Sequence, residues 1–286
     1  MYYEKIAMVI GVCALAAAVS GASHRNWNTE ARESVNHVFT GDKTLNVDNI
    51  NGLIQIIGDN GTTIRVDGEK IIRGADQQQV DRGKREVVLD INEKNGVAQL
   101  YVNGPFRENS HASENHGFHE NGDREYEVTY NFTIHVPHDT GLELRSVNGD
   151  VKTEQTNGKF DVHGVNGDVT MTSIAGSGEV RTVNGGMVLS FRESPKAASK
   201  FNTVNGKIDA TFPANLSADL SFKTVNGATY TDFDVTALAS PPGTAEQKDG
   251  KFVYKRNRIT TVRAGSGGPE LSFETVNGQI RIQKAH

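Results

Sequence analysis

The chain has 286 residues, of which 36% are hydrophobic and 30 are glycine, and its formal net charge is −5. The acidic balance, without a basic stripe, argues against a nucleic-acid binder and provides no attraction to anionic lipid. The low hydrophobic share fits an elongated fold of thin layers better than a compact sphere, because each layer then needs few large apolar side chains.

The first 22 residues are expected to be a secretory signal peptide. An apolar stretch at 6–19 follows Lys5 and precedes the small residues at 20–22. It is short for a membrane span, and no second apolar run follows. We therefore expect an exported protein, in the periplasm or on the cell surface, with no transmembrane segment in the mature chain. An uncleaved anchor and lipidation at Cys13 are the alternatives.

Residues 23–39 are expected to be a flexible segment, and residues 40–286 a single β-rich domain. Alternation of apolar and polar residues predicts most of its early strands, and an Asn-Gly dipeptide between two of them predicts a hairpin. In chain order we expect two strands around an Ile-Asn-Gly corner at 45–57, a strand at 63–67, a short helix at 74–83, a hairpin at 86–102 and a strand at 126–136.

An internal repeat dominates the second half. Asn-Gly occurs 12 times, and seven of these dipeptides are Val-Asn-Gly. Positions two and four after most of these glycines are apolar and the residue between them is mostly polar, which indicates a strand with one buried face. Asn-Gly itself supplies the positive-φ residues of a tight turn. The seven asparagines are Asn103, Asn148, Asn166, Asn184, Asn205, Asn226 and Asn277.

Two architectures fit this repeat. Asn-Gly forms either the turns of an antiparallel meander or the corners of a β-solenoid. Asn148, Asn157 and Asn166 are nine residues apart, and the later steps are 18 and 21. Two strand–turn units per coil favour the second architecture, with identical residues in register along one wall. We expect an all-β, single-domain β-solenoid or β-helix-like stack of short strands with Asn-Gly corners.

The pattern also resembles a known family. The strings Tyr-Asn-Phe-Thr-Ile-His-Val-Pro at 130–137 and Leu-Glu-Leu-Arg-Ser-Val-Asn-Gly-Asp-Val at 142–151 are similar to the bacterial "putative adhesin" family with β-strand repeats. Residues 45–56 look like its first coil and residues 265–282 like its last, so the resemblance covers about residues 40 to 284. It implies an exported β-solenoid of the cell envelope, and it offers no catalytic residues.

One cluster has the composition of a metal site. His111, His116 and His119 lie among three acidic residues in a polar insertion near 104–124. Histidine and carboxylate side chains bind Zn²⁺, although this spacing matches no closed-site motif. A solvated loop is the alternative interpretation, and no other cofactor is expected.

Catalysis finds little support in the sequence. It contains no Gly-x-Ser-x-Gly elbow, no His-Glu-x-x-His and no phosphate loop. The Asn-Gly-Asp corners at Asp150 and Asp168 raise the possibility of Ca²⁺, but an aspartate beside a turn usually satisfies nearby backbone. We therefore expect no enzyme.

A second insertion near 236–258 interrupts the repeat and is expected to project as a loop and β-ribbon. We expect an adhesin-like binding or scaffold module that contacts an envelope protein or a surface glycan. The alternatives are an envelope-stress sensor with a protein partner and, less favoured, a carbohydrate-active enzyme on a β-helix. An exposed final strand at 279–284 would permit end-to-end association. The candidate contact residues are Lys251, Phe252, Tyr254, Lys255, Arg256 and Arg258.

Overall fold

The computed structural model describes residues 27–107, 126–238, 244–248, 251–255 and 259–285. Within them the chain forms two large mixed sheets, one small two-stranded sheet and one α-helix, which confirms the all-β class. The predicted signal peptide, residues 1–22, lies outside the described residues.

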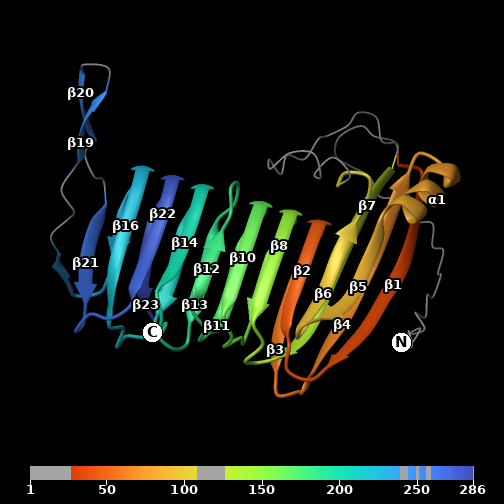
Figure 1. Ribbon diagram of the computed structural model, residues 1–286, viewed down its shortest axis with the longest axis horizontal. Helices are drawn as coiled ribbons and strands as arrows, with labels where there is room; N and C mark the ends of the chain where they lie inside the picture. Colours follow the sequence, from red (N-terminus) through yellow and green to blue (C-terminus); the bar gives the residue numbers. More distant parts are fainter. Residues whose placement is uncertain (1–26, 108–125, 239–243, 249–250, 256–258, 286) are drawn as a thin grey trace.

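The two large sheets lie one over the other (Figure 1). The ten-stranded sheet has the order β1 (Thr29–Thr40), β4 (Thr63–Gly74), β7 (Tyr126–Pro137), β3 (Ile54–Asp59), β9 (Val151–Glu154), β11 (Val169–Ile174), β13 (Met187–Phe191), β15 (Ile208–Phe212), β23 (Ile280–Lys284) and β17 (Thr229–Thr231). The eleven-stranded sheet has the order β18 (Val235–Ala237), β21 (Thr260–Ala264), β16 (Ala218–Asn226), β22 (Glu270–Asn277), β14 (Ser199–Asn205), β12 (Gly178–Arg181), β10 (Phe160–Asn166), β8 (Leu142–Asn148), β2 (Thr44–Asn51), β6 (Val97–Asn103) and β5 (Val88–Lys94).

Strands β8–β17, β22 and β23, called the stack below, carry the Val-Asn-Gly repeat. The chain alternates between the sheets, because β8, β10, β12, β14, β16 and β22 lie in one sheet and β9, β11, β13, β15, β17 and β23 in the other. All neighbours within the stack are parallel, with partners 18 residues apart in the first coils and 21 in the next, and the register of β11 against β13 shifts between Met171 and Ile174. Each Asn-Gly corner therefore carries the chain from one sheet to the other.

The core lies between the two sheets. The residue two positions after the corner glycine is buried at Val151, Val169 and Ile208, as the alternation predicts. Phenylalanines fill the wide part of the stack: Phe201 stacks on Phe273 at a centroid distance of 5.0 Å, and Phe191 on Phe212 at 4.6 Å. Edge contacts of 6.0 and 6.3 Å join the two pairs across the sheets. Aromatic packing of this kind adds to the free energy of area burial.

The final strand is not exposed, which corrects the expectation for residues 279–284. Strand β23 pairs with β15 on one side and with β17 on the other, and β22 likewise lies between β14 and β16. The last coil in sequence is therefore inserted before the coil of β16 and β17. The stack ends instead at the coil of β16 and β17, where Thr229 replaces the buried apolar residue and is exposed.

The other end is a different structure, called the cap below, made of β1, β4–β7 and α1 (Gln77–Glu86). The expectation of a flexible segment at 23–39 is wrong from Thr29 onward, because β1 pairs with β4 over its whole length. The helix begins after Asp76, whose carboxylate accepts a hydrogen bond from the Gln79 N–H at 2.9 Å. The hairpin of β5 and β6 turns at Asn95 and Gly96, both with positive φ, as predicted.

Candidate interaction surface

An asparagine ladder runs along the corners of the stack. Each side-chain amide donates to the amide oxygen of the asparagine on the neighbouring coil, at 2.7–2.9 Å. The ladder starts at Asn51, which donates to the carbonyl oxygen of Val128, and ends at Asn226. Its order is Asn51, Asn148, Asn166, Asn184, Asn205, Asn277 and Asn226.

Hydroxyl groups support the same corners, a feature that the sequence analysis missed. Thr203 and Thr275 donate to the carbonyl oxygens of Gly185 and Gly206 at 2.9 and 3.0 Å. Ser146, Thr182 and Thr224 make the equivalent contact to a corner glycine. The available signal was a serine or threonine two residues before the asparagine in five of the corners, which extends the motif to Ser/Thr-Val-Asn-Gly.

Two aspartates beside the corners accept hydrogen bonds from backbone N–H groups. The Asp150 carboxylate accepts the Asp168 N–H at 3.0 Å, and the Asp168 carboxylate accepts the Gly186 N–H at 2.7 Å. Each carboxylate thus tightens the contact to the next coil, as expected for an aspartate beside a turn.

A row of valines lines the outer face of the eleven-stranded sheet beside the ladder. Val165, Val183, Val204 and Val225 are between 36% and 46% exposed, and each comes directly before the asparagine of its corner. The corner of Asn277 lies between those of Val204 and Val225. Such a repeated apolar row costs free energy in water unless a partner covers it. The structure confirms the predicted register of these valines along one wall. We call them the valine row.

Two charged rows run parallel to the valine row on the same face. Arg145, His163 and Arg181 face one another across β8, β10 and β12, and Glu143, Asp161 and Glu179 do the same one pleat away. The carboxylates of the acidic row repel one another. Along the strands, Asp161 contacts His163 at 2.7 Å, and the ion pair of Glu179 with Arg181 offsets part of this repulsion. The basic row lies between the acidic row and the valine row.

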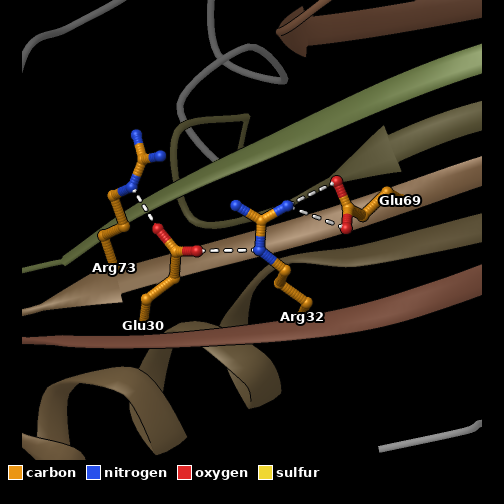
Figure 2. Close-up of polar contacts among 4 residues, drawn as sticks. All are labelled: Glu30, Arg32, Glu69 and Arg73. Carbon is orange, nitrogen blue, oxygen red and sulfur yellow. Dashed lines mark hydrogen bonds and ion pairs between the residues drawn. The ribbon is translucent and has the colours of Figure 1, made fainter. Parts of the chain in front are cut away.

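A third charged group lies on the outer face of the cap (Figure 2). Glu30 accepts hydrogen bonds from Arg73 at 2.7 Å and from Arg32 at 2.8 Å, and Arg32 also reaches Glu69 at 3.0 Å. The bond from Arg73 is the main reason that the pKa of the Glu30 carboxyl lies below its ordinary value. Each of the four charged side chains pairs with an opposite charge of β1 or β4, so this group attaches the edge strand β1 to β4.

Inside the cap, a lysine is buried between the sheet and the helix. Lys70 is 5% exposed, and its ammonium group donates to the Lys84 carbonyl oxygen at 3.1 Å and lies 3.5 Å from the Glu33 carboxylate. Burial lowers the pKa of Lys70, because the charged form loses its hydration. The neighbouring ring of Tyr130 is also buried, and burial raises the pKa of its phenol.

The predicted site residues fall largely outside the structure. His111, His116 and His119 lie outside the described residues, as do Arg256 and Arg258. The backbone of Lys251, Phe252, Tyr254 and Lys255 forms β20 (Lys251–Lys255), which pairs with β19 (Thr244–Lys248) as the predicted β-ribbon. The ribbon extends away from the large sheets (Figure 1), but its side chains are not among those described.

The part of the chain that the structure describes contains no group of three or more His, Cys, Asp or Glu side chains that could hold a metal ion. Its only helix is too short to cross a membrane.

No family model and no curated protein matches the chain. Among solved structures, it is similar to a "putative cell adhesion protein" from Clostridium sporogenes, with 12% identity over 89% of this chain and 100% of that one and a TM-score of 0.42. A "putative adhesin" from Bacteroides fragilis matches at 12% over 88% and 97%, with a TM-score of 0.37. A "putative lipid binding protein" from Parabacteroides distasonis matches at 11% over 88% and 97%, with a TM-score of 0.28. The two adhesin names belong to the class that the sequence resembles, while TM-scores below 0.5 carry no argument about the activity of this chain.

Proposed function

We propose that the stack is a short β-solenoid and that the protein is an exported, non-catalytic binding module of the cell envelope. The alternation of the chain between two sheets whose strands are parallel within the stack supports the first part. The signal-peptide pattern at 1–22 supports export.

The observation that carries the binding proposal is the outer face of the eleven-stranded sheet. Its valine row is apolar, exposed and regular, and the basic row of Arg145, His163 and Arg181 flanks it. A partner with an apolar ridge beside acidic side chains would complement both rows. The outward positions of β8, β10, β12, β14 and β22 contain no phenyl, phenol or indole ring. Aliphatic side chains without such rings favour a protein surface over a glycan.

The experiment compares two matched valine-to-serine changes. The triple variant Val165→Ser, Val183→Ser and Val204→Ser alters the valine row, whereas Val188→Ser alters an equally exposed valine, 43% exposed, on the ten-stranded sheet. Purified mature protein is added to envelope fractions of its own host, and the retained amount is measured. We expect retention by the wild type and by Val188→Ser, and loss in the triple variant.

Protease treatment of the envelope fraction distinguishes the class of partner. Loss of retention after treatment supports a protein partner, while unchanged retention would indicate a glycan and contradict the choice of partner. Retention by the triple variant equal to that of the wild type would contradict the proposed face.

Export and exposure are tested separately. Protease shaving of intact cells that carry a tagged chain should digest it if the module lies on the surface, and should digest it only after lysis if it lies in the periplasm. Recovery of the tagged chain in the cytosolic fraction, with residues 1–22 intact, would contradict export.

A further inference from the structure

The asparagine ladder ends at a corner that is chemically different from the others. At an interior corner, three hydrogen bonds fix the asparagine side-chain amide and the glycine N–H. Asn184 donates to Asn166 at 2.9 Å and accepts from Asn205 at 2.8 Å, and the Gly185 N–H donates to the Asn205 carbonyl oxygen at 3.1 Å. Both the amide side chain and the following backbone nitrogen are therefore fixed.

The corner at Asn226 retains only one of these bonds. Its side chain donates to Asn277 at 2.7 Å, but no described residue donates to its amide oxygen or accepts the N–H of Gly227. The cause is topological, because this coil is the last in the stack and no further corner of the described residues covers it. The Asn226 side chain is also exposed. The opposite end differs, since Asn51 donates to Val128 and the Gly52 N–H donates to Asn148.

This difference matters because Asn-Gly is a reactive sequence. The backbone nitrogen of the glycine, after losing its proton, attacks the side-chain amide carbon of the asparagine. A new N–C bond forms, ammonia leaves, and a five-membered succinimide results. Water then opens the ring at either carbonyl, which gives aspartate or isoaspartate. The net change exchanges ammonia for water and needs no enzyme or cofactor.

The interior corners resist this reaction for two reasons. A hydrogen bond from the glycine N–H to a carbonyl oxygen holds the proton that must leave. The two side-chain hydrogen bonds of the ladder prevent the asparagine side chain from rotating its amide carbon toward the glycine nitrogen. At Asn226 the glycine N–H bond is missing, and only one of the two ladder hydrogen bonds is present.

We propose that Asn226 is a deamidation site, and that the ladder protects the six other asparagines that it contains. The reaction places a carboxylate next to the amide oxygen of Asn277, where the original amide donated a hydrogen bond. Two acceptors then face each other, so modification loosens the last coil, β16 and β17, from the rest of the stack. The open end of the stack is thus where chemical ageing of the repeat begins.

Peptide mapping of the folded, mature protein tests the proposal. Trypsin separates Asn148, Asn166, Asn184, Asn205, Asn226 and Asn277 into six different peptides, because Lys or Arg lies between each pair. After incubation in warm, mildly alkaline buffer, mass spectrometry measures the one-dalton gain and the isoaspartate in each peptide. We expect conversion at Asn226 to be faster than at Asn184 by about tenfold or more, as two fewer hydrogen bonds must break first.

Denatured protein is the control, and there all six rates should become similar. In folded protein, equal rates at Asn226 and Asn184 would overturn the proposal, whether both are slow or both are fast. A second measurement uses Asn277→Ala, which removes the last side-chain restraint on Asn226. We expect faster conversion at Asn226 in this variant, and an unchanged rate would contradict protection by the ladder.

Discussion

The stack and the cap solve the same problem, the burial of one face of each sheet, in opposite ways. In the stack every coil repeats the contacts of its neighbour, and its buried polar side chains are serines and threonines such as Ser146, Thr203 and Thr275. The cap has antiparallel strands, a helix and a buried charge, Lys70. In a repeat, each backbone and side-chain polar group forms its hydrogen bond with the equivalent group of the next coil. Where repetition stops, each remaining group needs its own partner.

The largest effect is expected from removing a repeated core contact. Phe273 is fully buried and stacks on Phe201 and Phe222, at 5.0 and 5.8 Å. Phe273→Ala should lower the free energy of unfolding by about 3–5 kcal/mol through the lost transfer term and the cavity. Urea denaturation followed by circular dichroism measures this. Phe273→Leu keeps aliphatic volume but removes the ring, so it should lose less than Phe273→Ala; a stability equal to that of the wild type would mean that the ring contacts contribute nothing.

In the cap, the largest effect is expected from isolating a buried charge. Glu33→Ala leaves the ammonium group of Lys70 with the Lys84 carbonyl oxygen but without its carboxylate. Removing one partner of a buried pair should cost about 3 kcal/mol. Glu69→Ala on the outer face of the same sheet is the matched control, since its pair with Arg32 is exposed. A loss for Glu33→Ala no larger than for Glu69→Ala would contradict the importance of Lys70 burial.

Because of the same lysine, we expect the free energy of unfolding of the cap to depend on pH in a way that the stack should not share. The pKa of Lys70 is lowered in the folded protein, so between that value and its ordinary 10.5 the unfolded chain binds more protons. The free energy of unfolding therefore rises with pH in that window. Wild type should gain stability relative to Lys70→Met as pH rises toward 10.5, and the raised pKa of Tyr130 cancels in this difference because both proteins contain Tyr130. Parallel pH profiles of the two proteins would contradict this.

A smaller effect is expected within the ladder itself. Asn184→Ala removes two side-chain hydrogen bonds and Asn226→Ala removes one. At about 1 kcal/mol per bond, or less at an exposed site, the interior change should cost about twice as much as the end change. Thermal unfolding of both variants measures the difference. Equal losses would show that the ladder does not act as a series of neighbouring contacts.

The smallest effect is expected at the charge group on the outer face of the cap. Arg73→Gln removes the main hydrogen bond to Glu30 but leaves Arg32 in place. An exposed pair of this kind contributes at most about 1 kcal/mol, and salt should screen it. The stability difference from wild type should shrink as salt is raised. A loss that is large and independent of salt would mean that Arg73 acts through packing instead.

Several parts of this architecture were predictable because their causes are local. The alternation around Val151 and Val169 determines which face is buried, and Asn95-Gly96 determines a two-residue hairpin. The valine row was predictable because in-register coils align identical residues. The charged rows follow from the same rule, since acid-x-base triplets recur at Glu143, Asp161 and Glu179.

Other parts depend on contacts between distant residues. Strand β1 looks unstructured because polar residues such as Glu33 and His37 occupy its inward positions, yet β4 pairs with all of it and Lys70 faces Glu33. The contact between Lys70 and Glu33 cannot be predicted from the sequence without knowing that β1 pairs with β4.

Local sequence specifies the strands, their buried faces and the Asn-Gly corners, because turn geometry and period-two burial act within a few residues. The order of the coils depends on contacts between strands that are distant in the sequence. Every coil presents the same Val-Asn-Gly edge, so β22 and β23 can pair with either neighbour, and local sequence does not distinguish the end of the stack from its interior. Their insertion between β14–β15 and β16–β17 leaves Asn226, rather than Asn277, as the last member of the ladder.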